Sequence, residues 1–197
     1  MFTSIAIIGR PNVGKSTLFN KLTKTREAIV SDFPGLTKDR NYGYLKLGSF
    51  KSMIIDTGGI GKDSSSLSQN ISDQAWVAAH ESNLILFLID GSENLSSEDF
   101  EILSRLRKIN KPFLTLLNKS DKSSKSDAID DITSKGITEY LEISAEHSRG
   151  LDVLKKSLLD KFPEKDTETI IDGKKIAVLG RPNAGKSTFI NNFIKQD

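Results

Sequence analysis

The chain has 197 residues, of which 37% are hydrophobic and 27% are charged, and a formal net charge of +2. This composition predicts a globular protein with a packed core and excludes wholesale disorder, and the charge argues neither for nor against a nucleic-acid partner. Cysteine is absent, which excludes disulfides, thiol catalysis and cysteine-ligated metals within these residues.

The amino-terminal stretch predicts a buried strand. MFTSIAIIGR has no basic segment ahead of a long apolar run, so we expect no signal peptide. The most apolar run, LILFLID at residues 84–90, is much shorter than the roughly 20 residues that a membrane span needs. We therefore expect a cytoplasmic protein without a membrane partner.

A phosphate-binding loop follows this strand. GRPNVGKS fits the pattern GxxxxGK[ST] between an apolar strand and a helix. Backbone N–H groups of such a loop surround phosphate oxygens, and the helix dipole adds to the attraction. Lys15 is expected to bridge the β- and γ-phosphates and Ser16 to ligate Mg²⁺. The motif leaves adenine or guanine open. The expected nucleotide contacts of the loop are Gly9, Asn12, Val13, Gly14, Lys15, Ser16 and Thr17.

An antiparallel hairpin and an acidic strand end come next. Residues 41–56 predict two strands joined around Gly48 and Ser49. Asp56 ends the second strand, where its carboxylate can reach Mg²⁺ through water, and the Gly59 N–H can approach a γ-phosphate because no side chain intervenes. This DxxG pattern is weak alone but strong after a phosphate loop.

The remaining elements complete an alternating pattern. Strands are predicted at residues 84–90, 112–118 and 139–144. Apolar residues at helical spacing predict two core-facing helix faces, formed by Phe100, Ile102, Leu103, Leu106, Leu151, Leu154, Leu158 and Leu159. The pattern predicts an α/β fold with a mostly parallel six-stranded sheet, one antiparallel edge strand, and helices on both faces.

The segment NKSD closes a predicted strand and favours guanine. Guanine presents N1–H and N2–H donors on one edge, which the Asp121 carboxylate can accept together, whereas adenine offers no such pair. Asn118 can address the O6/N7 side of the base or brace the loop, and the Lys119 stem can cover a base face. After the next strand, Ser144 and Ala145 can offer a backbone N–H toward O6.

A second copy of the first strand, loop and helix lies near the end of the chain. IAVLGRPNAGKSTFIN repeats IAIIGRPNVGKSTLFN. We expect a first domain at residues 1–162, a polar linker at 163–174, and at 175–197 the first strand, loop and helix of a second domain. The alternative, that this copy completes the first domain, conflicts with the full sheet predicted upstream. We expect Lys186 to bind no nucleotide tightly.

These motifs resemble the translation-factor-like GTPases and, more closely, the double-GTPase family Der, also called EngA. The resemblance covers the whole chain and is carried by GRPNVGKST, FPGLTKDR, DTGGI, NKSD, ISAEHSRG and GRPNAGKST. It implies a P-loop GTPase domain that hydrolyses GTP to GDP and phosphate with Mg²⁺. It also implies a nucleotide-dependent switch in assembly of the large ribosomal subunit, which is the expected partner beside GTP and GDP. No nucleic-acid module is expected in this chain.

The resemblance also implies catalytic and metal-binding roles. Thr37 becomes the switch threonine that contacts Mg²⁺ and the γ-phosphate, although on its own it could be a turn residue. Ile60 stands where many GTPases place a water-orienting glutamine, so slow intrinsic turnover is expected. Asn12 is expected to hold K⁺ against the phosphates and stimulate hydrolysis, or merely to shape the loop. The expected catalytic set is Asn12, Lys15, Thr37 and Gly59; the metal set is Ser16, Thr37, Asp56 through water, and Asn12 for potassium.

Two alternative functions remain open, and the arginine and histidine side chains are given no catalytic role. The competing interpretation is a catalytically inert GDP/GTP-binding fragment that lacks the domains needed for ribosome binding. An ATP-dependent enzyme is disfavoured by NKSD. We do not favour Arg10 or Arg40 as an arginine finger, because loop arginines are more often solvated or paired with carboxylates. We expect His80 and His147 to be ordinary surface or packing residues.

Overall fold

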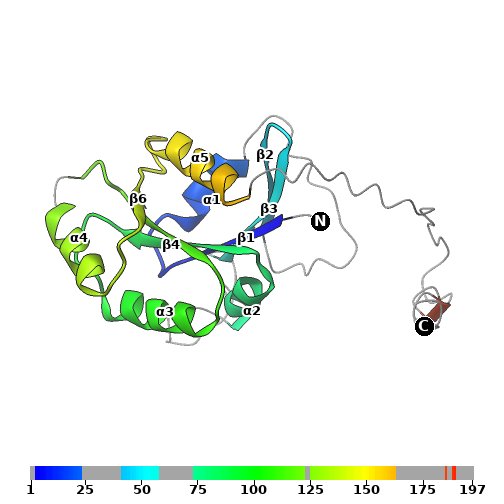
Figure 1. Cartoon of the computed structure of the whole chain (residues 1–197), viewed down its shortest axis with the longest axis horizontal. Coiled ribbons are helices and arrows are strands. Elements are labelled where there is room, and N and C mark those ends of the chain that lie inside the picture. Colours follow the sequence, from blue (N-terminus) through cyan, green and yellow to red (C-terminus); the bar gives the residue numbers. More distant parts are fainter. Residues whose placement is uncertain are drawn as a thin grey trace. The chain divides into compact units, whose positions relative to one another are not determined.

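Figure 1 shows the computed structural model of the chain, which describes residues 3–23, 41–57, 73–122 and 125–162, and three residues near the end, 185, 188 and 189. The chain divides into two compact units, Met1–Glu164 and Lys165–Asp197. Several predicted features lie outside the described residues, namely Thr37, Arg40, Gly59, Ile60, Lys186 and the linker at 163–174.

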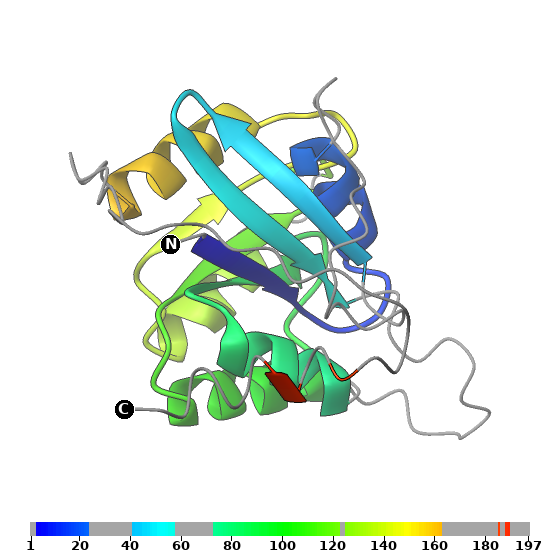
Figure 2. The same ribbon diagram turned by 90° about the vertical axis from the view of Figure 1, so that its right-hand side faces the viewer.

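The apolar runs of the first unit form one sheet, which has six strands in the described part of the chain, in the order β2-β3-β1-β4-β5-β6. β2 runs antiparallel to β3, as the hairpin in Figure 2 shows, and all other neighbouring strands are parallel. The strands are β1 Thr3–Ile8, β2 Asn41–Leu47, β3 Phe50–Asp56, β4 Leu84–Asp90, β5 Phe113–Asn118 and β6 Tyr140–Glu142. The predicted sheet, with its antiparallel edge strand, is confirmed.

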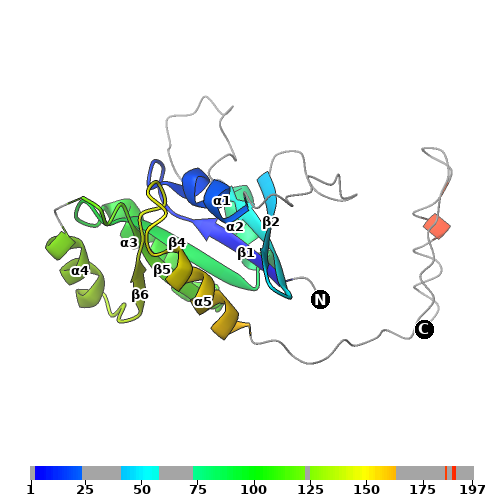
Figure 3. The same cartoon turned by 90° about the horizontal axis from the view of Figure 1, so that it is seen from above.

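Helices cover both faces of this sheet. α1 and α5 lie over one face, and α2 and α3 lie against the other (Figures 1 and 3). The helices are α1 Lys15–Thr23, α2 Asp73–Glu81, α3 Ser97–Lys108, α4 Lys125–Ser134 and α5 Leu151–Lys161. Within the described residues, no helix combines the length and the apolar character that crossing a membrane requires.

β4 supplies both cores from one strand. All seven of its residues are buried. Because side chains alternate between the faces of a strand, Leu84, Leu86 and Leu88 enter the core under α1 and α5. The alternate residues Ile85, Phe87 and Ile89 enter the core under α2 and α3. β4 is therefore a fully covered central strand, as its unbroken apolar run predicts.

Two details differ from the prediction. The last strand ends at Glu142 instead of residue 144, because Ser144 pairs with Arg149 across a tight turn through backbone hydrogen bonds of 3.0 and 3.1 Å. Leu159 is 37% exposed, although it was expected in the core. It follows the fully buried Leu158, and one residue of helix turns a side chain about 100° away from the core.

Candidate nucleotide-binding site

The predicted site residues lie at the ends of neighbouring strands. In the strand pairing, Asp56 of β3 lies beside Ile7 of β1, and Asp90 of β4 lies beside Asn118 of β5. These strands are parallel, so their carboxyl ends meet at one edge of the sheet, which is where open α/β sheets bind ligands. The fold therefore gathers the phosphate loop, the DxxG aspartate and NKSD at one edge.

The phosphate loop is a tight turn pressed against its neighbours. Asn12 and Gly14 have positive φ angles of 64° and 100°, a region that asparagine tolerates and glycine favours. A Cβ added at Gly9 would lie 2.3 Å from the Leu88 carbonyl oxygen, and one added at Gly14 would lie 2.3 Å from Asn118 Nδ2. Close packing thus requires glycine at both positions, and at Gly14 the backbone conformation requires it as well.

Lys15 is held inside this loop. Its Nζ donates hydrogen bonds to the carbonyl oxygens of Gly9 (2.8 Å) and Arg10 (2.7 Å), and its side chain is buried. Burial lowers the pKa of Lys15 to about 8, with a further lowering from the Arg10 charge that the Asp56 carboxylate and, more weakly, Glu98 oppose. The ammonium group is therefore weakly solvated and positioned where phosphate oxygens could replace carbonyl oxygens as its partners.

Oxygen donors suited to Mg²⁺ flank Lys15. Ser16 and Thr17 are exposed in the first turn of α1, and Asp56 is buried at the end of β3. Thr57 donates its hydroxyl to the Ile7 carbonyl oxygen over 2.6 Å, which fixes the end of β3 against β1. Hydroxyl and carboxylate oxygens are hard ligands of the kind that Mg²⁺ prefers, so this donor set fits the ion.

Asn118 braces three loops. Its Nδ2 donates to the Val13 carbonyl oxygen over 2.7 Å, and its Oδ1 accepts the Ala145 N–H over 2.9 Å. Of the two roles open from the sequence, the structure shows bracing. The Ser144 N–H donates to the Arg149 carbonyl oxygen. Both N–H groups offered to O6 thus have partners within the chain, and their contact with a base stays a prediction.

The segment NKSD at residues 118–121, here named the base loop, is joined to β4 by Lys119. The φ of Lys119 is 62°, and its Nζ donates to Asp90 Oδ2 over 2.5 Å. Burial alone would raise the pKa of Asp90, but hydrogen bonds from Lys119 and Ser92 and the Lys119 charge outweigh burial and hold it below its usual value. This carboxylate therefore stays ionised and keeps the Lys119 stem along the edge of the site.

Asp121 is the carboxylate expected to read guanine. Its side chain is 22% exposed. A hydrogen bond from the Ser144 hydroxyl lowers the pKa of Asp121 against the opposing effect of partial burial, and a backbone hydrogen bond and the proximity of His147 and Arg149 lower it further. His147 Nε2 lies 3.5 Å from Asp121 Oδ2. Sequence reasoning missed this neighbour, and the signal for it was the position of His147 in the turn that follows Ser144.

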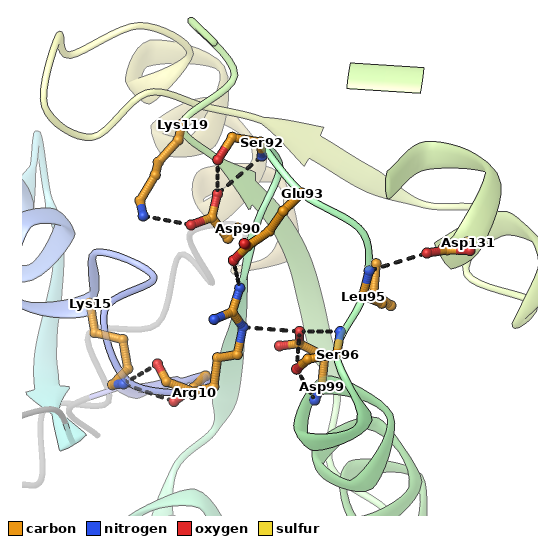
Figure 4. A network of polar contacts seen from close by, with 11 residues as sticks. Arg10, Lys15, Asp90, Ser92, Glu93, Leu95, Ser96, Asp99, Lys119 and Asp131 are labelled. Atoms are coloured by element: carbon orange, nitrogen blue, oxygen red, sulfur yellow. Dashed lines mark hydrogen bonds and ion pairs between the residues drawn. The ribbon is translucent and has the colours of Figure 1, made fainter. Parts of the chain in front are cut away.

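Arg10 points away from its own loop and toward α3. Its Nε donates to Asp99 Oδ2 over 3.1 Å, and its Nη2 pairs with Glu93 Oε1 (Figure 4). Burial alone would lower the pKa of Arg10, but the hydrogen bond that Arg10 donates to Glu93 and the charges of Asp99, Glu93 and Asp90 outweigh burial and raise it. Of the two states expected for a loop arginine, solvated or paired with carboxylates, Arg10 adopts the second. The partners themselves were missed, although SSED, ending at Asp99, carries the spacing of a capping box.

Comparison with known proteins identifies the family. The model of the family described as 50S ribosome-binding GTPase matches residues 4–119 and 175–197, which is more than half of the chain. The chain belongs to this family.

The GTPase relatives include both curated proteins and solved structures. GTPase Der of Legionella pneumophila (strain Corby) is 46% identical over 198 aligned residues, which cover 100% of this chain and 43% of that protein. The chain thus spans less than half the length of this relative. A crystal structure of Era from Aquifex aeolicus bound to GDP.AlF4⁻ has a TM-score of 0.66 and 34% identity, covering 83% of this chain and 58% of that one.

A second Era structure supports the same assignment. Era in complex with MgGDPNP and a segment of 16S ribosomal RNA has a TM-score of 0.66 and 33% identity, covering 90% of this chain and 59% of that one. The resemblance to Der and the P-loop GTPase fold are confirmed.

Proposed function

We propose that the first unit binds GTP and GDP at this sheet edge and hydrolyses GTP to GDP and phosphate. The observation that carries the proposal is the Asn118 side chain, which ties the base loop to the phosphate loop at Val13 and to Ala145 after β6. A nucleotide contacts both ends of the site at once, so these ends must be held relative to each other, and Asn118 supplies one link between them.

Guanine recognition rests on Asp121. Its lowered pKa keeps the carboxylate ionised and able to accept the N1–H and N2–H donors of guanine. Lys119 and Ser144 hold the loop around it, through Asp90 and through the Asp121 carboxylate itself. ADP lacks this donor pair and should bind at least about tenfold more weakly than GDP, since an unpaired polar group at such a site is costly.

The catalytic part of the proposal uses Lys15, Ser16 and Asp56, with Asn12, Thr37 and Gly59 added from the resemblance. Lys15 would bind the β- and γ-phosphates, while Ser16, Thr37 and, through water, Asp56 would hold Mg²⁺. The positive charge of the ion would stabilise the negative charge that shifts between phosphate oxygens during hydrolysis. Asn12 is exposed at the turn of the loop, where it could contribute to a potassium site.

A role in assembly of the large ribosomal subunit belongs to the proposal as well. The support for this part of the proposal is the description of the matched family as 50S ribosome-binding, since 50S is the large subunit. We propose the large subunit as the partner of the protein, a cytoplasmic location, and residues 175–197 as the start of a second GTPase domain after a linker at 163–174. The competing function is a GDP/GTP-binding module without turnover.

Steady-state GTP turnover separates the two functions. We would measure phosphate release with Mg²⁺ in potassium chloride and in matched sodium chloride, with the Asn12→Ala variant alongside. Faster release in potassium that the variant loses supports a potassium-assisted GTPase. No release in either salt, despite GDP binding that exceeds ADP binding, supports the module without turnover.

A further inference from the structure

Arg10 is a charged side chain of the phosphate loop that the proposed chemistry leaves unused. Its partner Asp99 has a side chain that is 1% exposed. Besides the Arg10 guanidinium, Asp99 Oδ2 accepts the Ser96 N–H (3.0 Å) and the Ser96 hydroxyl (2.8 Å). Ser96 is the N-cap of α3, and its hydroxyl accepts the Asp99 N–H in return. Arg10 is thus attached to a buried, fixed point of the fold.

The chain segment that carries Asp99 also contacts the base loop. Residues 90–99, here named the β4–α3 segment, contain both acidic partners of Arg10. At the other end of this segment, Asp90 accepts a hydrogen bond from Lys119, and the Gly91 N–H donates to the Asn118 carbonyl oxygen over 2.7 Å. Figure 4 shows Arg10 and Lys119 reaching the segment from two different loops.

We propose that Arg10 is a positioning residue that, through Asp99 and Glu93, holds the phosphate loop and the base loop in the relative position that a guanine nucleotide needs. This inference rests on the proposed function. It assigns Arg10 an effect on base recognition although its side chain faces α3.

Two anchors explain why Asn118 does not suffice. Asn118 holds the loop at Val13, near its end, while Arg10 holds it near its start. One anchor permits rotation of the loop about that point, whereas two anchors fix its orientation. The start of the loop matters to phosphate binding because Lys15 Nζ donates to the carbonyl oxygen of Arg10 itself.

The test compares the affinities of the full chain for GDP and IDP, measured by titration calorimetry. IDP lacks the 2-amino group, so Asp121 loses one hydrogen bond and IDP should bind roughly tenfold or more weakly than GDP. In Arg10→Gln we expect weaker GDP binding and a GDP preference over IDP that falls about fivefold. Loss of a positive charge near the phosphates cannot produce that second change, because both ligands carry the same phosphates.

Two further variants control for charge and for folding. Lys155→Gln removes a cation from α5, outside both loops, and should leave both affinities unchanged. Arg10→Gln with Asp99→Asn removes both charges of the buried pair, so no uncompensated carboxylate is left to prevent folding. This double variant should show the same loss of preference.

The outcomes separate the inference from the proposed function. Equal weakening of GDP and IDP in both Arg10 variants would show that the arginine acts only as a nearby charge and would overturn the positioning role. Unchanged affinities would overturn it as well. If the wild-type chain bound IDP and ADP as tightly as GDP, the proposed guanine site would be wrong, and the positioning role of Arg10 would be wrong with it.

Discussion

The two copies of the phosphate loop can be compared at two residues that the structure describes in each, Gly14 and Leu18 in the first and Gly185 and Phe189 in the second. Gly14 and Gly185 have φ angles of 100° and 79°. The N–H groups of Leu18 and Phe189, four residues later, donate to the carbonyl oxygens of these glycines over 2.9 Å. Leu18 is fully buried, whereas Phe189 is 58% exposed.

The surroundings of the two glycines differ in the same direction. A Cβ at Gly14 would strike Asn118, but one at Gly185 would meet no described atom within 4 Å. The glycine conformation and the hydrogen bond that follows it thus recur at both described positions, whereas the packing against Gly14 is supplied by Asn118, from a distant part of the chain.

The largest expected effect distinguishes the two lysines. Lys15→Ala should weaken GDP binding about 100-fold or more, because it removes charge-assisted hydrogen bonds to the phosphates. Lys186→Ala should leave the affinity unchanged, because the NKSD segment and DxxG aspartate of the chain lie in the first unit. Calorimetry of both variants checks this, and two GDP molecules per wild-type chain would contradict it.

The second-largest expected effect is on stability, where truncation of Leu18 and truncation of Phe189 should differ. Leu18→Ala should lower the free energy of unfolding by about 3 kcal/mol, because it leaves a cavity in a closed core. Phe189→Ala should change it by less than about 0.5 kcal/mol, as expected for an exposed position. Urea unfolding followed by the fluorescence of Trp76, the one tryptophan of the sequence, reports on the first unit. Equal effects of the two changes would refute the comparison.

Alanine substitution of Gly14 and of Gly185 should also affect stability differently, by a smaller amount. Gly14→Ala adds a collision with Asn118 to the strain of a positive φ, so it should destabilise the first unit by about 2 kcal/mol. Gly185→Ala carries only the strain and should leave unfolding of the first unit unchanged. The same urea series measures both, and a harmless Gly14→Ala would mean that Asn118 is not held as firmly as its two hydrogen bonds indicate.

The smallest expected effect is a dependence on pH. Lys15 has a pKa of about 8, and phosphate binding favours its charged form, so binding takes up a proton above pH 8. Affinity for GDP should be level below that pH and about tenfold lower at pH 9 than at pH 7. In Lys15→Arg, whose guanidinium stays charged, this slope should disappear. A slope shared by both proteins would have to come from another group.

Local patterns explain what the sequence could predict. Strand positions followed from runs such as LILFLID, and the loop and NKSD followed from short motifs whose chemistry is local. The missed features join distant residues: Arg10 with Asp99, and Lys119 with Asp90. The composition and spacing of the two partners do not reveal such pairs, because the fold must first bring them together.

Smaller misses have similarly specific causes. The end of β6 depends on the turn in which Ser144 pairs with Arg149, and this pairing replaces the continuation to residue 144 that the run EYLEIS predicted. Leu159 fits the helical period less well than Leu158 beside it, and only the packing against the sheet decides which of two adjacent leucines is buried.

β4 has a consequence for how the first unit comes apart. Its alternate side chains belong to two cores on opposite faces, so neither layer of helices can detach without uncovering half of the same strand. The layers should therefore unfold cooperatively, and the amide protons of β4 should exchange with solvent only through global opening. A single strand thus makes two cores one thermodynamic unit.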